Sequence, residues 1–263
     1  MVLRTLRAAL AVAAVTLALP AAANAALFDF PLEGWWPMNE GSGQTVRDWS
    51  GNNNHGYLGL SPSPDDADPV WVDGVWWGSA LRFISDDRVT IPARPKLKPQ
   101  RLTVSTWVRW KPDAPLGGTS PGIFKFPISM GGDGCRISSY GMFTDVNERL
   151  VFYIGTTAGQ TITSPATPAS IWDGKWHHVA GTFDGSKVRM YYDGVQMGSG
   201  TSVPSGTKID YSFASKGGAI GNYAGECEEA LAMQGDVDGL QIWSTTLPVD
   251  TIWKLLKSLF TSR

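Results

Sequence analysis

The stretch Asp48–Gly59 (DWSGNNNHGYLG) gathers side chains that could hold a cation or cap backbone amides. It contains one carboxylate (Asp48), one serine, three consecutive asparagines and His55. Gly and Asn tolerate left-handed backbone geometry, so such a loop can turn several carbonyl oxygens inward. Ca²⁺ takes about six to eight oxygen ligands of these kinds. The alternative is a metal-free loop in which Asp48 accepts hydrogen bonds from turn amides.

The histidines offer little for catalysis or metal binding. The chain has three, and His177 and His178 are adjacent, so on a strand they point to opposite faces and cannot share a metal ion. The sequence contains no metalloprotease helix motif, Cys-His zinc spacing or nucleophile elbow.

The first residues have the pattern of a secretory signal peptide. Arg4 and Arg7 precede the unbroken apolar run Ala8–Leu19, and small residues follow up to Ala25. The run is too short for a resident membrane helix, and a membrane anchor is the less favoured alternative. We expect cleavage after Ala25, which leaves residues 26–263 as one secreted domain without a membrane span.

Export would place the two cysteines, Cys135 and Cys227, in an oxidising compartment. An even count in such a compartment predicts a disulfide, with two free thiols as the alternative. That bridge would bring together a candidate ligand-binding group formed by Arg136, Tyr140, Tyr223 and Glu226.

Charge excludes some partners. The formal net charge is −2 at pH 7, which gives no electrostatic footprint for nucleic acid or anionic lipid. We expect a monomer whose partner is an extracellular glycan or glycoprotein.

Short alternating segments dominate the chain. RLTVSTWVRW (101–110), RLVFYI (149–154) and ALRFI (80–84) are predicted strands,. KWHHVAGTFDGSKVRMYYDG (175–194) predicts a hairpin around Asp184-Gly185-Ser186,. Near the end, LPVDTIWKLLKSLF (247–260) predicts one short helix that packs on the sandwich,. The fold class is therefore an all-β, two-sheet antiparallel β-sandwich with a short C-terminal helix.

The order of several motifs adds to this prediction. WWPMNEGSGQTVRDWSGNNNHGYLG (35–59) is followed by GSALRF (78–83), LTVSTWVRW (102–110), GKWHHVAGTFDGSKVRMYYDGV (174–195) and GDVDGLQIW (235–243). This series resembles the laminin-G-like jelly-roll domains of the concanavalin A-like lectin/glucanase superfamily. The resemblance covers about residues 34–256 and implies two curved sheets of about six or seven strands each, one with a concave face.

In that family, the segment that Asp48 begins resembles a structural calcium loop. The resemblance implies Asp48 as a carboxylate ligand and Asn53 and His55 as sources of backbone oxygens. It implies a second carboxylate from Asp238, with Asp236 as the alternative. Two departures from the family pattern are Trp49, where a small or polar residue is usual, and Gly239, where an acidic residue is common.

Related glucanases carry their catalytic carboxylates as Glu-x-Asp-x-x-Glu on one strand, and this sequence lacks that motif. The nearest cluster, Glu226–Glu229, has loop-like surroundings. We therefore expect a secreted, non-catalytic binding module, foremost for carbohydrate. A polysaccharide hydrolase or lyase acting in the concave groove and a protein-adhesion module are the alternatives.

Overall fold

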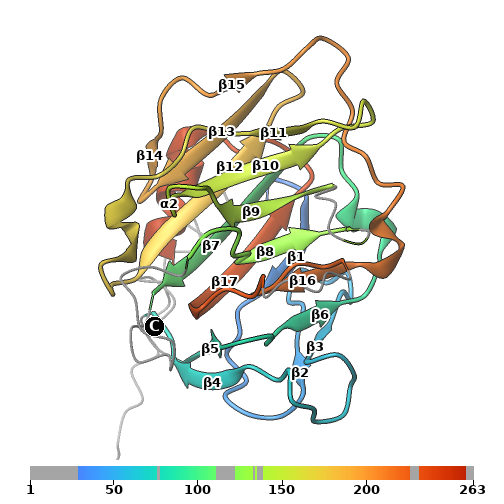
Figure 1. The fold of residues 1–263 in the computed structure, drawn as a ribbon, viewed down its shortest axis with the longest axis vertical. Coiled ribbons are helices and arrows are strands. Elements are labelled where there is room, and N and C mark those ends of the chain that lie inside the picture. The colour runs from blue at the N-terminus through green and yellow to red at the C-terminus, as the bar shows by residue number, and fades with distance from the viewer. Residues whose placement is uncertain are drawn as a thin grey trace, which may run out of the picture.

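The computed structural model describes residues 29–75, 78–110, 122–132, 134, 139–225 and 231–258. Within them the chain forms two antiparallel sheets packed face to face, with one short helix near the C-terminal end (Figure 1). This confirms the predicted all-β sandwich. The sheets have nine and eight strands, more than the expected six or seven, because several strands are only two residues long.

The nine-stranded sheet contains both the first and the last strand of the described chain, which pair with each other. Its strands are β1 (Leu32–Trp36), β4 (Val70–Asp73), β5 (Ser79–Phe83), β7 (Leu102–Arg109), β12 (His177–Phe183), β13 (Lys187–Tyr192), β14 (Val195–Gln196), β15 (Thr201–Ser202) and β17 (Gly235–Trp243). Their order is β14-β13-β12-β7-β17-β5-β4, with β1 also paired to β17 and β15 to β13.

The smaller sheet covers the other side of the core. Its strands are β2 (Thr45–Val46), β3 (Gly56–Leu58), β6 (Val89–Ile91), β8 (Ile128–Met130), β9 (Tyr140–Thr144), β10 (Leu150–Gly155), β11 (Thr161–Thr163) and β16 (Gly218–Ile220). Their order is β11-β10-β9-β8-β16-β6-β3-β2. Three 3-10 turns lie in the connections, at Pro95–Leu97, Ala169–Trp172 and Ala214–Lys216.

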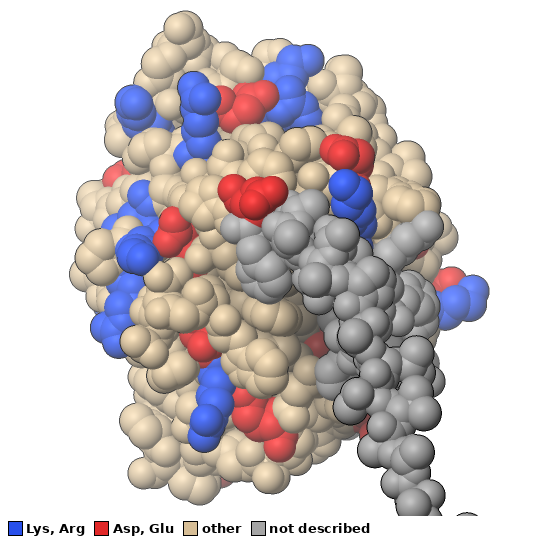
Figure 2. Space-filling model, turned by 180° about the vertical axis from the view of Figure 1, so that it is seen from behind, with Lys and Arg blue, Asp and Glu red and all other residues tan. Residues whose placement is uncertain are grey.

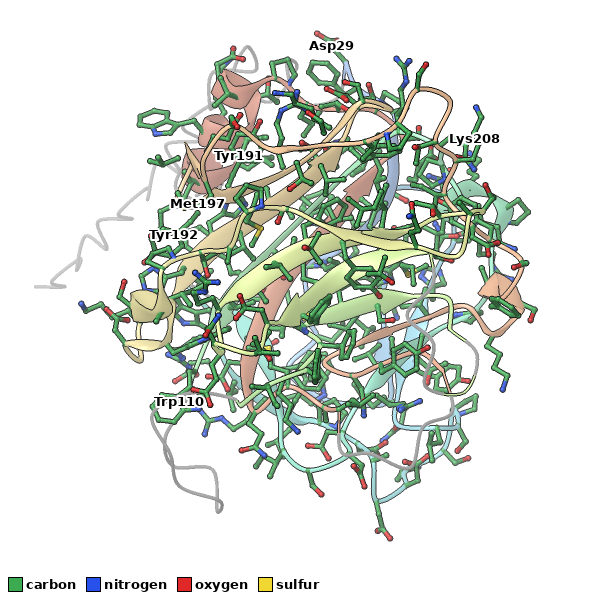
Figure 3. All side chains as sticks on the ribbon, turned by 45° about the horizontal axis from the view of Figure 1, so that its top comes forward. Asp29, Trp110, Tyr191, Tyr192, Met197 and Lys208 are labelled. Atoms are coloured by element: carbon green, nitrogen blue, oxygen red, sulfur yellow. The ribbon has the colours of Figure 1, made fainter. Side chains whose placement is uncertain are left out.

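The predicted alternation on β7 decides which side chains form the core. Leu102, Val104 and Val108 are fully buried between the sheets. Trp107 and Arg109 therefore point to the outer face of the nine-stranded sheet. Side chains fill the space between the sheets, and Trp110 lies where β7 ends (Figure 3).

The predicted hairpin is confirmed as β12, a turn and β13. Asp184 Oδ1 accepts hydrogen bonds from the backbone N–H groups of Ser186 and Lys187, each at 2.7 Å. Gly185 has a φ of 89°, which a side chain would make unfavourable.

The predicted C-terminal helix is also confirmed, as α2 (Val249–Ser258). Ile252 and Leu255 are buried and pack with Tyr191 and Trp243. The helix thus covers part of the outer face of the nine-stranded sheet. Among the described residues, no helix is long and apolar enough to cross a membrane. Lys/Arg and Asp/Glu side chains are interspersed on the face seen from behind (Figure 2).

Gly181 on β12 provides a test of the packing between the sheets. A Cβ added at this position would overlap the ring of Phe152 on β10. We expect Gly181→Ala to lower the free energy of unfolding by about 1–3 kcal/mol, because overpacking forces neighbours to move. Chemical denaturation would measure it. Phe152→Ala removes the two ring atoms nearest to that Cβ, so Gly181→Ala should cost less in the Phe152→Ala background than in the wild type, and strictly additive effects would contradict this account.

Candidate functional site

Asp48 is a buried residue to which the loop after β1 is hydrogen bonded, and we call its carboxylate with the amides bonded to it the Asp48 hub. Its side chain is 6% exposed. Oδ1 accepts hydrogen bonds from the backbone N–H groups of Trp35 and Ser50, each at 2.9 Å, and Oδ2 accepts one from Asn54 at 2.8 Å. The Asp48 N–H donates to Nδ1 of His55 at 3.0 Å. Both carboxylate oxygens are therefore engaged by amide donors.

The asparagines fasten this loop to β1. Asn54 Nδ2 donates to the carbonyl of Glu33 at 2.6 Å, and the Asn54 carbonyl accepts from the indole of Trp36 at 2.9 Å. Asn52 Nδ2 also donates to the Glu33 carbonyl, at 3.1 Å. Asn53 has a φ of 57°, as the predicted left-handed geometry requires. The composition of the loop is thus explained by hydrogen bonds to the backbone.

The predicted calcium ligands come from two parts of the fold. Asp48, Asn53 and His55 share the loop, whereas Asp238 lies on β17 and accepts a hydrogen bond from the Val75 N–H at 2.9 Å. Within the described part of the chain, no three His, Cys, Asp or Glu side chains converge as a metal site. The three amide hydrogen bonds occupy three of the roughly four acceptor positions of the Asp48 carboxylate,, and calcium binding there stays a prediction.

A polar and aromatic group occupies the outer face of the nine-stranded sheet. The strand register places one row across β5, β17 and β7 and a second row across β17, β7 and β12. We call this group the β7–β17 face. Its members are Arg82, Asp236 and Arg109 in the first row, and Asp238, Trp107 and His178 in the second.

Asp236, the alternative calcium ligand, is clamped by two arginines. The carboxylate is fully buried, and Arg82 Nε donates to Oδ1 at 2.7 Å. Arg109 donates to Oδ2 through Nε at 2.8 Å and Nη2 at 2.5 Å. The Arg109 guanidinium also lies 4.5 Å above the ring of Trp176. A buried carboxylate with this many charged donors is a structural ion pair with little capacity left for a metal.

Asp238 lies in the neighbouring row in a different environment. Burial raises the pKa of its carboxyl to about 7, although hydrogen bonds from Val75 and Gly239 act in the other direction. Burial also lowers the pKa of His178 to about 4, which leaves this imidazole neutral at physiological pH. The His178 ring meets Trp107 edge to face at 5.3 Å. Sequence reasoning named Asp238 only as a metal ligand and missed its proton chemistry.

The adjacent histidines do point to opposite faces, as predicted. His178 is paired with Trp107 on the outer face, whereas His177 is opposite Val108. His177 Nδ1 lies 2.8 Å from Asp193 and Nε2 lies 3.1 Å from Asp173. These two carboxylates raise the pKa of His177, chiefly through the Asp193 hydrogen bond.

The predicted ligand-binding group is only partly described. Tyr140 lies in the core between the sheets, and its hydroxyl donates to the Leu97 carbonyl at 3.0 Å. Tyr223 belongs to a separate cluster with Phe126 and Tyr153 on the other face of the eight-stranded sheet. The two tyrosines are therefore not brought together. Four further predicted residues lie outside the described part of the chain: Cys135, Arg136, Glu226 and Cys227.

Sequence reasoning also missed a pair of surface tryptophans. Trp49 is 57% exposed, and its ring meets Trp35 at 5.8 Å between centroids. The signal was present in the sequence, because Trp49 directly follows the hub Asp48 and Trp35 alternates with the core residue Trp36.

The comparisons agree with this architecture. The family model for the concanavalin A-like lectin/glucanases superfamily matches residues 83–252. No curated protein sequence matches the chain.

Solved structures share the fold at low sequence identity. Domain 4 of AbnA, an extracellular arabinanase from Geobacillus stearothermophilus solved with arabinotriose, has a TM-score of 0.57 and 18% identity. That match covers 86% of this chain and 98% of that one. The binding domain of Paraclostridial Mosquitocidal Protein 1 has a TM-score of 0.60 and 15% identity, over 90% and 54% of the two chains. The ligand-binding domain of botulinum neurotoxin serotype D, solved with N-acetylneuraminic acid, has a TM-score of 0.61 and 12% identity, over 88% and 52%.

The hub predicts a large effect of Asp48→Ala on stability. The variant leaves three N–H donors without their acceptor, in a part-buried setting. We expect a loss of about 2–4 kcal/mol in the free energy of unfolding, since orphaned donors cost about 1–3 kcal/mol each and water can reach some of them. Chemical denaturation measures this. Asp66→Ala, at an exposed position of a nearby loop, is the control and should be nearly silent.

The same variant tests the calcium prediction. If an ion binds at Asp48, calcium raises the melting temperature of the wild type and EGTA lowers it. Asp48→Ala then abolishes that response. A wild-type melting temperature that is unchanged by EGTA leaves Asp48 with its hydrogen-bonding role alone.

Asp238 predicts a pH-dependent stability. Its pKa is about 7 in the folded protein against an ordinary value of 3.8. Between these two pH values the folded state keeps a proton that the unfolded chain has lost, so the free energy of unfolding falls as pH rises. We expect Asp238→Asn, measured in EGTA by calorimetry, to melt near wild type at pH 4 and above it at pH 8. The exposed Asp250→Asn is the control, and parallel curves for wild type and Asp238→Asn would refute the account.

Proposed function

Because the chain belongs to the concanavalin A-like lectin/glucanases superfamily, we propose that it is an extracellular module that binds carbohydrate without cleaving it. The observation that carries the proposal is the similarity to domain 4 of the arabinanase AbnA. That domain is matched over 98% of its length and is described in complex with arabinotriose. A second neighbour, the neurotoxin domain, is described in complex with N-acetylneuraminic acid.

The state of the described carboxylates supports binding rather than hydrolysis. A retaining or inverting glycosidase needs two carboxyl groups that reach the sugar from either side of the scissile bond. Asp48 accepts hydrogen bonds from three backbone amides, and Asp236 is fully buried between Arg82 and Arg109. Both carboxylates are thus held by structural partners, which favours a structural role over that of a nucleophile or a base.

A hydrolase is the second candidate, and Asp238 is the observation that favours it. A carboxylic acid with a pKa near 7 has the property that a glycosidase acid requires. Asp238 also shares a strand face with Asp236, two residues away. Its side chain is only 5% exposed, so the β7–β17 face would have to open before a glycan could reach it.

The export of the chain is part of the proposal and rests on the sequence pattern of residues 1–25. The proposed disulfide between Cys135 and Cys227 and the proposed monomeric state depend on that export.

Binding and product release separate the two candidates. We expect saturable binding by calorimetry to at least one of arabinotriose, linear arabinan and sialyllactose, with no reducing ends released from arabinan, xylan or β-glucan. Release of reducing ends that is lost in Asp238→Asn would establish the hydrolase. A wild-type protein that binds none of these probes and no member of a glycan array would overturn carbohydrate binding and favour a protein partner.

A further inference from the structure

Trp35 and Trp49 form an aromatic corner on the surface, which we call the Trp35–Trp49 corner. Their ring centroids lie 5.8 Å apart with 67° between the ring planes. Such an edge-to-face contact leaves both faces of the edge-contributing ring uncovered by its partner. Trp49 is 57% exposed, the largest exposure of any described tryptophan. Tryptophan is enriched among the residues that carry most of the binding energy at contact sites.

The corner is held rigidly, although it is exposed. The Trp49 N–H donates to the Trp35 carbonyl at 2.7 Å. The neighbouring Asp48 carboxylate fixes the Trp35 N–H and the turn at Ser50. The next hydroxyl, Ser50 Oγ, bonds the Glu33 carbonyl at 3.2 Å. The loop therefore presents its indole in a set position, so little backbone ordering remains to oppose binding.

Two amide side chains lie on the elements that carry the corner or pair with it. The partly exposed Gln241 lies directly opposite Trp35 on β17. Asn52 lies in the same loop, and the ammonium of Lys96 is already bonded to its Oδ1 at 2.6 Å. Neutral hydrogen-bonding groups beside an aromatic face suit a ligand that is apolar on one side and hydroxylated at its rim.

We infer that the Trp35–Trp49 corner is a glycan subsite, in which a neutral sugar ring stacks its C–H face on the exposed indole of Trp49. This inference rests on the proposed carbohydrate-binding function and assigns it to one place. The hydroxyl rim of the sugar would lie toward Gln241. The hydrogen-bond-rich stretch from Asp48 to Gly59 then has a purpose, since it holds the stacking residue on the edge of β1.

The test uses the full chain and a matched tryptophan control. Arabinan, xylan, glucomannan and mixed-linkage β-glucan are the probes in affinity electrophoresis, followed by calorimetry on the one that binds. We expect Trp49→Ala to weaken binding at least about tenfold, as for a central aromatic contact. Trp49→Phe should retain part of it. Trp253→Ala, which removes a 47% exposed indole on α2, should bind like the wild type.

The outcomes separate this inference from the function on which it rests. If the wild type binds a probe and folded Trp49→Ala binds it equally well, the site lies elsewhere while carbohydrate binding stands. If Trp49→Ala and Trp253→Ala weaken binding to the same extent, the effect is not local and the inference fails. If the wild type binds no glycan, both fail. Melting temperatures of all variants confirm that each is folded, and Trp49→Phe decides the case should the alanine variant unfold.

Discussion

Strand β17 is the constraint on which the rest of the structure depends, because it pairs with three strands from different parts of the chain. Its first half lies between β5 and β7, and its second half lies between β1 and β7. The register shifts between Asp238 and Gln241, where Gly239 has a φ of 61°. Such a bulge needs glycine and inserts an extra residue into the alternation. Val237 therefore points inward before the bulge, whereas Leu240 and Ile242 point inward after it.

The first strand is fastened to this framework by the Asp48 hub. β1 pairs with β17 on one side. The loop after β1 is hydrogen bonded to its backbone through Asp48, Asn52 and Asn54. Backbone groups on the unpaired side of an edge strand are left to water unless a partner satisfies them. The Asp48 carboxylate and the side-chain amides of Asn52 and Asn54 supply those partners here. The same residue types that suggest a cation site therefore also suit a loop whose side chains cover the edge of the sheet.

Alternation and turn residues in a few segments are enough to predict the all-β class, although β9, β10 and β12 are buried along their whole length. The strand β7, the hairpin at Asp184-Gly185-Ser186 and the helix α2 all lie where the sequence places them. The candidate site could not be predicted in the same way. Whether Asp48 holds a metal or amides depends on which donors lie within reach, and those donors include Trp35, 13 residues earlier in the chain. A single sequence does not contain this information. The hydroxyl and amide content of the loop leaves two interpretations, a calcium site or a metal-free loop closed by hydrogen bonds.

The different environments of Asp236 and Asp238 could not be predicted from the local sequence. They share a strand, a face and a residue type, and they are separated by one core valine. Asp236 meets two arginines from β5 and β7, whereas Asp238 lies opposite Trp107 and accepts a hydrogen bond from the Val75 N–H in the loop after β4. Burial favours the neutral form of the Asp238 carboxyl group and raises its pKa,. The difference arises from the strand order, which places Arg109 opposite Asp236 and Trp107 opposite Asp238. A buried carboxyl group with a raised pKa beside a carboxylate paired with two arginines is compatible with a rigid scaffold, and the surface that we propose for a glycan is instead the exposed indole of Trp49.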